Sequence, residues 1–374
     1  MKRWYAVLMI VGLLFSLCAC TQEEGSAQSP PPVQSAQQQQ EQQEQQEQQT
    51  ADTETTQQEQ QTADTEITQQ EQQTADTETT QQPEAAQGTP VVYMTQEITP
   101  EGLMAVYQAL QWEPQGRVAV KLSTGEPPAS NYLRPELIAG LVQSLDGTIV
   151  ECNTAYGGSR AETAMHYQVA EEHGFTAIAD FQILDEEGSM TLPVQDGTRL
   201  SENYVGAAFE DYDSYLVLSH FKGHSMAGYG GAIKNISIGL GSSEGKAWIH
   251  SAGSSRTNPW GGDQDAFLES MAEAGKSVSD YLGDQIVYIN VMNRLSVDCD
   301  CDGNPAEPDM HDIGILASTD PVALDQACID LVYSTEDGQS LVNRIESRNG
   351  LHTLEHAQQI GLGSRSYELV SIDG

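Results

Sequence analysis

Ser214-Tyr-Leu-Val-Leu-Ser-His220 is an apolar run that leads directly into a segment rich in glycine, Phe221-Lys-Gly-His-Ser-Met-Ala-Gly-Tyr-Gly-Gly-Ala-Ile-Lys-Asn235. The run predicts a buried strand that ends at His220. Ligands of open α/β sheets bind beyond the carboxyl ends of the strands, and glycines let the backbone approach a ligand closely. The histidines and lysines of the segment therefore predict a functional site. The plainer alternative is a tight turn with surface lysines and one core histidine.

Strands and helices alternate along the rest of the chain. Further apolar runs predict strands over residues 117–122, 148–152, 176–179, 285–292 and 312–317. Helical stripes and end signals predict helices over residues 135–145, 160–173, 265–282 and 320–333, and a polar hairpin-like segment lies near 185–200. This alternation is typical of a mostly parallel sheet flanked by helices. We therefore predict an α/β domain over residues 91–374, built as one domain or as two lobes that share a core.

The amino terminus has the pattern of a bacterial lipoprotein. Lys2 and Arg3 precede a short apolar run that ends in Leu17-Cys-Ala-Cys20, which is similar to a lipobox. The pattern predicts a signal peptide over residues 1–19 and lipid attachment at Cys20, which would anchor the protein on the extracytoplasmic face of the cell membrane. An ordinary secretory peptide and a short membrane anchor are the alternatives.

Residues 20–90 are rich in Gln, Glu and Thr. The unit Thr-Ala-Asp-Thr-Glu recurs from Thr50, Thr62 and Thr74, and the segment has almost no apolar residues. It therefore predicts a disordered acidic tether. The chain as a whole has 55 acidic and 16 basic residues and a formal net charge of −39. This charge disfavours nucleic acid as a partner, so we expect the partners to be the membrane and a small ligand or metal.

A polar loop follows the strand predicted over residues 148–152. In a parallel sheet this loop reaches the same edge as His220. Its polar side chains could hold a carboxylate or phosphate, Arg160 through a bidentate fork. The residues that we predict to bind an anion, in this loop and after His220, are Asn153, Tyr156, Ser159, Arg160, Lys222, Gly230, Gly231 and Asn235. The alternative is a loop folded on its own hydrogen bonds, with a helix cap at Ser159.

Two cysteines lie close together in Asp298-Cys-Asp-Cys-Asp302, and His311 follows nearby. Thiolates, imidazoles and carboxylates together favour a borderline metal such as Zn, Ni or Fe. The predicted metal ligands are His220, His250, Cys299, Cys301 and His311. The alternatives are a disulfide with Cys152 or Cys328, which an exported protein permits, and a polar turn that supports the end of the sheet. Cys328 itself is predicted to pack in the core of an amphipathic helix.

Residues 116–372 resemble the domain-of-unknown-function family 362. The matching motifs are Asn131-Tyr-Leu-Arg-Pro135, Gly158-Ser-Arg160, His220-Phe-Lys-Gly-His224, Gly230-Gly-Ala-Ile-Lys-Asn235, Gly245-Lys246 with His250, and Asp320-Pro-Val-Ala-Leu-Asp325. Members of that family often carry a ferredoxin-type insert. Because no Cys-x-x-Cys-x-x-Cys run follows His250 in this chain, no iron–sulphur cluster of that type is expected.

The segment is also distantly similar to the nickel-pincer lactate racemases. The shared spacing comprises His224, Ala227-Gly-Tyr229, Lys234 ten residues after His224, and His250 sixteen residues after Lys234. The resemblance implies an acid/base role for His224, a tether or charge role for Lys234 and metal ligation by His250. The racemases' other catalytic histidine has no match in this chain.

The leading hypothesis is therefore an extracytoplasmic lipoprotein with a metal-binding or anion-binding site centred on His220, His224, Lys234 and His250. As an enzyme it would transfer a proton through His224 to or from a small acid. The alternative is a non-catalytic surface protein that binds a metal or a small ligand.

Overall fold

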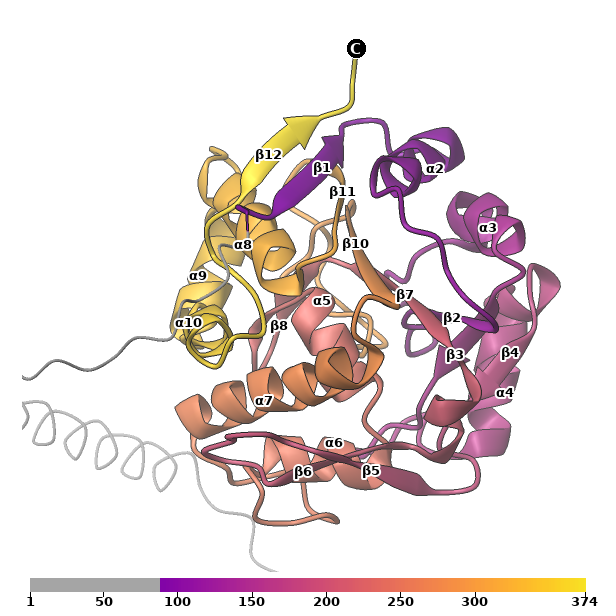
Figure 1. Ribbon diagram of the computed structural model, residues 1–374, viewed down its shortest axis with the longest axis vertical. Helices are drawn as coiled ribbons and strands as arrows, with labels where there is room; N and C mark the ends of the chain where they lie inside the picture. Colours follow the sequence, from indigo (N-terminus) through magenta and orange to yellow (C-terminus); the bar gives the residue numbers. More distant parts are fainter. Residues whose placement is uncertain (1–87) are drawn as a thin grey trace, which may run out of the picture. The chain divides into compact units, whose positions relative to one another are not determined.

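An eight-stranded sheet runs through residues 88–374, the part of the chain that the computed structural model describes (Figure 1). The signal peptide, Cys20 and nearly all of the tether lie outside the described residues. In sheet order the strands are β12 (Glu368–Ser371), β1 (Val91–Thr95), β11 (Gly314–Ser318), β10 (Ile286–Met292), β7 (Ser214–His220), β2 (Val118–Lys121), β3 (Thr148–Glu151) and β4 (Phe181–Ile183). Strands β10, β7, β2, β3 and β4 are mutually parallel. The predicted α/β class with a mostly parallel sheet is confirmed.

Strand β7 lies in the middle of the sheet, and the cores on its two faces explain why its central residues are apolar. Alternate residues of β7 enter two different cores: Tyr215 and Val217 enter one, and Leu216 and Leu218 enter the other. A strand with both faces covered has no solvent side, so it becomes a continuous apolar run.

Helices cover both faces of the sheet. One face is covered by α2 (Pro100–Ala109), α3 (Pro135–Ser144) and α4 (Thr163–Glu172), and the other by α5 (Ala232–Lys234), α7 (Gln264–Leu282), α8 (Pro321–Tyr333), α9 (Gln339–Ser347) and α10 (His352–Gln359) (Figure 1). The π-helix η3 (Asn235–Gly239) and helix α6 (Ser243–His250) follow α5. Among the described residues, no helix is both long and apolar enough to cross a membrane.

Two short pairs of strands lie outside the main sheet. The polar segment near residues 185–200 becomes β5 (Ser189–Pro193), which pairs with β6 (Glu202–Gly206). Strands β8 (Lys222–His224) and β9 (Gly228–Gly230) form a second antiparallel pair directly after β7. This second pair folds the glycine-rich segment back over the end of the sheet.

The strand predicted over residues 176–179 is wrong. The 3-10 helix η1 (Phe175–Ala177) occupies the first half of that stretch, and β4 begins only at Phe181. Gly174 ends α4 in the left-handed conformation with φ 85°, and the buried Phe175 then packs into the core. A four-residue apolar run does not distinguish a strand from a buried helical turn.

The order of the strands locates the expected ligand site. Strands β2, β3 and β4 follow one another in one direction from β2, whereas β7 and β10 lie on its other side. The strand order therefore changes direction between the neighbouring strands β2 and β7. Ligands of open α/β sheets bind at the carboxyl ends of the strands at such a point.

Candidate functional site

A cavity of about 90 Å³ opens at the carboxyl ends of β2, β3 and β7. Lys121 ends β2, Glu151 ends β3 and His220 ends β7, and all three line the cavity. The cationic side chains around it are Lys121, Arg160, Lys222, Lys234 and Lys246. Its carboxylates are Glu151 and Asp300. Five of the chain's 16 basic residues thus surround one small cavity in a protein of net charge −39.

Glu151 compensates part of this positive charge. Its Oε2 lies 3.7 Å from Lys121 Nζ, and its Oε1 lies 3.4 Å from Arg160 Nη1. The same oxygen accepts from the backbone N–H of Thr124 at 2.6 Å. Burial raises the pKa of Glu151, but Lys121, His166 and Arg160 outweigh burial and hold it well below its usual range. Glu151 is therefore ionised and orients two of the cavity's cations.

Asp300 compensates a third cation. Its carboxylate accepts from Lys222 Nζ at 2.6 Å and lies 3.3 Å from His220 Nδ1. His220 Nε2 in turn donates to the carbonyl of Asn293 at 2.7 Å. Lys222 and Asp300 therefore form a buried ion pair beside His220, whose Nε2 is already bonded to the protein.

Lys234 differs from the other cations because no acceptor within residues 88–374 is in position to bond its Nζ. Its side chain lines the first cavity and also a second one of about 290 Å³. Burial, followed by the charges of Lys121, Arg160 and Lys246, lowers the pKa of Lys234 to about 8. The amine is therefore divided between charged and neutral forms near neutral to mildly alkaline pH and is available to a ligand.

Asp325 of α8 holds the segment that carries Lys234. Its carboxylate accepts from the backbone N–H groups of Ala232 and Ile233, at 2.8 and 3.0 Å, and from Asn290 Nδ2 at 2.8 Å. Burial raises the pKa of Asp325 to about 6, against the effect of these three donors. Asp325 is thus a positioning residue for Lys234.

His224 presents an N–H group to the second cavity. Its Nδ1 accepts from the backbone N–H groups of Met226, at 3.2 Å, and Ala227, at 2.9 Å. In a neutral imidazole the proton is then on Nε2. Burial, with Lys234 and His250 nearby, lowers the pKa of His224 well below its usual range. His224 is therefore neutral and offers the cavity a donor rather than a lone pair.

His250 has the opposite tautomer. Its Nδ1 donates to the carbonyl of Lys246 at 2.7 Å, so Nε2 keeps its lone pair. Burial lowers the pKa of His250 to about 4. The ring is held between Phe267, on which it stacks, and the edge of Tyr156. The second cavity is thus lined by a neutral donor, His224, a neutral acceptor, His250, the amine of Lys234, and the carboxylates of Asp298 and Asp302.

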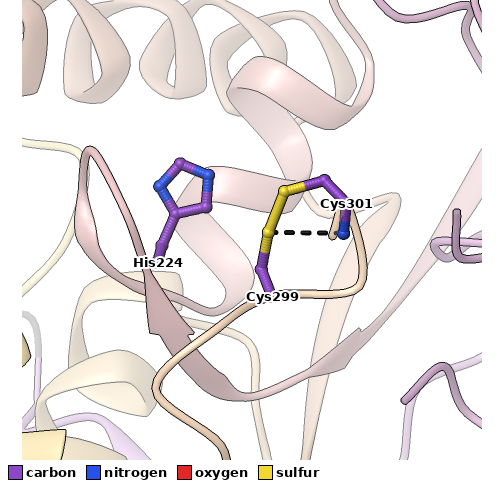
Figure 2. Close-up of side chains that lie close together, drawn as sticks. All are labelled: His224, Cys299 and Cys301. Atoms are coloured by element: carbon purple, nitrogen blue, oxygen red, sulfur yellow. Dashed lines mark hydrogen bonds between the residues drawn. A yellow bond between two sulfur atoms is a disulfide. The ribbon is translucent and has the colours of Figure 1, made fainter. Parts of the chain in front are cut away.

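Cys299 and Cys301 are bonded to each other and lie on the wall shared by the two cavities. Figure 2 shows a ring nitrogen of His224 facing their sulfur atoms. Potential ligand atoms of His224, Cys299 and Cys301 lie within 4.8 Å of one another, so this group could hold a metal ion. A metal fits the two cysteines only after reduction, and His224 fits poorly because its available nitrogen carries the proton.

A model of a family described as "Domain of unknown function (DUF362)" matches residues 118–330, more than half of the chain. The chain belongs to the DUF362 family. The family expected from the sequence motifs is thus confirmed. No curated protein matches the chain.

Two solved structures are distantly similar. The lactate racemase apoprotein from Thermoanaerobacterium thermosaccharolyticum has 15% identity and a TM-score of 0.33, with 54% of this chain and 50% of that chain covered. A structural-genomics protein from Thermotoga maritima has 12% identity and a TM-score of 0.35, with 70% and 58% covered. This DUF362 chain therefore spans less than two thirds of either protein, and the likeness is too distant to inform the site.

Most residues predicted for the site of this DUF362 protein do line the two cavities. They are Tyr156, Arg160, His220, Lys222, His224, Gly230, Gly231, Lys234, Asn235, His250, Cys299 and Cys301. Asn235 forms part of the cavity wall. Its Oδ1 accepts from Lys121 Nζ at 2.9 Å, and its Nδ2 donates to Ser219 Oγ at 3.0 Å.

Three predicted residues lie elsewhere. His311 was expected near the metal but lies at the surface, where it pairs with Asp337 at 2.9 Å. Asn153 is buried behind the loop and donates to Thr163 Oγ1. Ser159 donates through its backbone N–H to Glu126 in the loop after β2, and the helix cap expected at Ser159 is not formed, because Glu162 occupies the N-cap position of α4. Each of these polar groups is satisfied by protein partners, so neither His311 nor the two loop residues line the cavities.

The alternative of a disulfide between the Cys299–Cys301 loop and Cys152 or Cys328 is also wrong, because Cys152 and Cys328 are both free and buried. Cys328 packs in the core as predicted.

Sequence reasoning missed Lys121, Glu151, Lys246 and Asp300. Lys121 and Glu151 each close an apolar strand, and a charge at the carboxyl end of a buried parallel strand was the available signal. Lys246 and Asp300 gave no such signal. Lys246 lies within α6, where its Nζ donates to the carbonyl of Gly241 at 2.6 Å.

Proposed function

We propose that the two joined cavities bind a small organic acid and that Lys234 exchanges a proton with it. The observation that carries the proposal is the amine of Lys234, which has no partner in the described part of the chain and lies in a cavity where cations outnumber carboxylates. A buried cation is normally paired. An anionic ligand would supply the missing partner of Lys234.

Each lining group has a distinct task in this proposal. Arg160 and Lys121, already oriented by Glu151, hold the carboxylate of the ligand. Lys234, with a pKa of about 8, is near the ideal value for a base at neutral pH. His224 donates from Nε2 to an oxygen that gains negative charge, as neutral imidazoles do in other active sites. His250 accepts a hydrogen bond from a hydroxyl or N–H of the ligand.

In this proposal Lys234 transfers the proton, the role that the racemase resemblance implied for His224. A base needs a lone pair directed at the substrate. The lone pair of His224 is directed at the backbone N–H groups of Met226 and Ala227 instead.

Binding is tested by calorimetry on the purified, oxidised full-length protein with lactate, oxalate and inorganic phosphate. Micromolar to millimolar binding of one of these anions to wild type, lost in Lys234→Met and kept in Lys276→Met, supports the proposal. Lys276 is the matched control because it lies on α7 and pairs with Asp280 at 2.6 Å, away from both cavities. Binding that is unchanged in Lys234→Met would refute the proposal.

Proton transfer is tested separately by NMR in D2O. Wild type should exchange the α-hydrogen of lactate for deuterium, and Lys234→Met should not. Binding without exchange would leave a binding protein rather than an enzyme.

A second candidate is binding of a metal, favoured by the closeness of His224, Cys299 and Cys301. Two thiolates and an imidazole favour zinc, nickel or iron over magnesium or calcium. Reduced full-length protein should then retain one such ion through gel filtration. The variant with Cys299→Ser and Cys301→Ser should lose it. Retention by both would assign the metal elsewhere.

We also propose that the protein is anchored by lipid at Cys20 on the extracytoplasmic face of a bacterial membrane, with residues 20–90 as its tether. This proposal is supported by the lipobox-like pattern Leu17-Cys-Ala-Cys20 and by the composition of the segment that follows.

A further inference from the structure

The loop that carries Cys299 and Cys301 is anchored between the two cysteines and beyond them. Between the two cysteines, the Asp300 carboxylate pairs with Lys222, and its backbone carbonyl accepts from Glu126 N–H at 2.8 Å. Beyond them, the carbonyl of Gly303 accepts from Ala129 N–H at 3.0 Å. The two sulfur atoms are therefore held at the wall between the cavities, where a ligand of either cavity would meet them.

The surroundings of the sulfur atoms favour negative charge. The proton on His224 Nε2 follows from its two backbone donors, and a ring nitrogen of His224 lies within 4.8 Å of both sulfur atoms. Lys234 lines the same two cavities, and its amine has no hydrogen-bond or ion-pair partner among residues 88–374. Three carboxylates flank the pair in sequence. Asp300 pairs with Lys222. Asp298, which pairs with Arg344 at 3.2 Å, and the exposed Asp302 also line the second cavity.

We propose that Cys299 and Cys301 form a redox-active pair that exchanges with small thiols carrying a carboxylate. Reactive cysteines lie in partly exposed, electropositive surroundings, and this pair has such surroundings. The preference for an acidic thiol rests on the proposed function, because the anion cavity would hold its carboxylate while its sulfur meets the disulfide.

The reaction is two successive exchanges. The thiolate of the first substrate attacks one protein sulfur, the Cys299–Cys301 bond breaks, and the other cysteine leaves as a thiolate that receives the hydrogen bond of His224. A second substrate thiolate then attacks the substrate sulfur of the mixed disulfide and releases the remaining cysteine. Two thiols are oxidised to one disulfide, and the protein disulfide gains two electrons and two protons.

The test compares three thiols that differ in charge: 3-mercaptopropionate, 2-mercaptoethanol and cysteamine. The oxidised full-length protein is mixed with each, quenched with an alkylating agent, and followed by mass spectrometry of the peptide that contains both cysteines. Rates are divided by the thiolate concentration. The reference is the same protein unfolded in urea, in which Asp298, Asp300 and Asp302 flank the disulfide and favour the cationic thiol.

Folding should invert the charge preference. In the folded protein 3-mercaptopropionate should react at least about tenfold faster than cysteamine. Lys234→Met should remain reducible but lose that preference, whereas Lys276→Met should keep it. A folded protein that reacts faster with cysteamine, or no faster than the unfolded chain, would overturn the proposal. So would reduced protein that retains stoichiometric zinc in the presence of 3-mercaptopropionate, because the pair would then be a metal site.

The failure of this inference is distinguishable from failure of the proposed function. The variant with Cys299→Ser and Cys301→Ser cannot undergo exchange, but its anion cavity keeps all of its cations. Calorimetric binding of oxalate to this variant, together with no preference of wild type for the acidic thiol, would refute the redox centre alone. No binding of oxalate, lactate or phosphate by the variant or by wild type would refute the anion site, and the charge preference with it.

Discussion

Replacing Lys234 by Met should stabilise the ligand-free protein although it removes the central residue of the proposed site. The pKa of Lys234 is lowered from 10.5 to about 8 by burial and by neighbouring cations. One pKa unit corresponds to about 1.4 kcal/mol. Because Lys234 is only half-buried, the charged lysine destabilises the folded state by at most roughly 3 kcal/mol at pH 7, and an unbranched apolar side chain of similar length removes that penalty.

The sign of the pH dependence follows from linkage. Below about pH 8 Lys234 is charged in the folded and unfolded states, so the full penalty is present. Between pH 8 and 10.5 the folded state loses its proton first, and the wild type gains stability relative to the variant. The advantage of Lys234→Met should therefore be largest at pH 7 and nearly absent above pH 10.5.

The assay is thermal and urea unfolding of both full-length proteins at pH 7 and pH 10, in buffer without carboxylates or phosphate. A gain of roughly 3 kcal/mol corresponds to a rise in Tm of roughly 6–10 °C for a domain of this size. Lys276→Met should change stability by less than about 0.5 kcal/mol. A lower Tm for Lys234→Met, or an equal gain at both pH values, would refute the reasoning that the amine is an unpaired buried charge.

Three further predictions concern other parts of the chain. Glu273 is buried and accepts from the backbone N–H groups of Thr198 and Leu200. Glu273→Ala should therefore lower the free energy of unfolding in urea by about 3–5 kcal/mol, whereas the control Glu346→Ala, at an exposed position, should lower it by less than about 0.5 kcal/mol. Burial raises the pKa of Glu273, but its hydrogen bonds lower it to about 2, so its contribution should be present above about pH 4.5 and disappear as pH falls toward 2; a constant difference between wild type and variant over that range would contradict this. Asp325→Ala should reduce anion binding measured by calorimetry while Asp330→Ala should not, because only Asp325 bonds the segment that carries Lys234; equal affinities in both variants would remove its positioning role. Cys20→Ala should release the protein from membranes in cell fractionation, and a variant that stays membrane-bound would contradict lipidation.

Local patterns in the sequence were sufficient for the α/β class and for most of the elements. In the run from Ser214 to His220 the residues Tyr215 to Leu218 are apolar and buried on both faces of the sheet. The free energy gained by such burial depends mainly on the side chain of each residue, so it can be inferred from the sequence. The Asp320-Pro321 cap opens α8 as expected, since the Asp320 carboxylate accepts from the N–H groups two and three residues ahead. Lys234 and His250, which the sequence grouped only through a distant resemblance, line a common cavity.

What the tertiary structure alone decided is the electrostatic state of the site. Lys222 and Asp300 are 78 residues apart, and Lys121 and Asn235 are 114 residues apart. The donor character of His224 depends on backbone N–H groups that reach its ring only because β8 and β9 fold the segment back. His311 lies only ten residues from Cys301, yet its partner is Asp337. The tendency of a residue to be buried depends on its own side chain and can be inferred from the sequence. The charge and tautomer of a buried group depend instead on partners that only the folded chain brings within hydrogen-bonding distance.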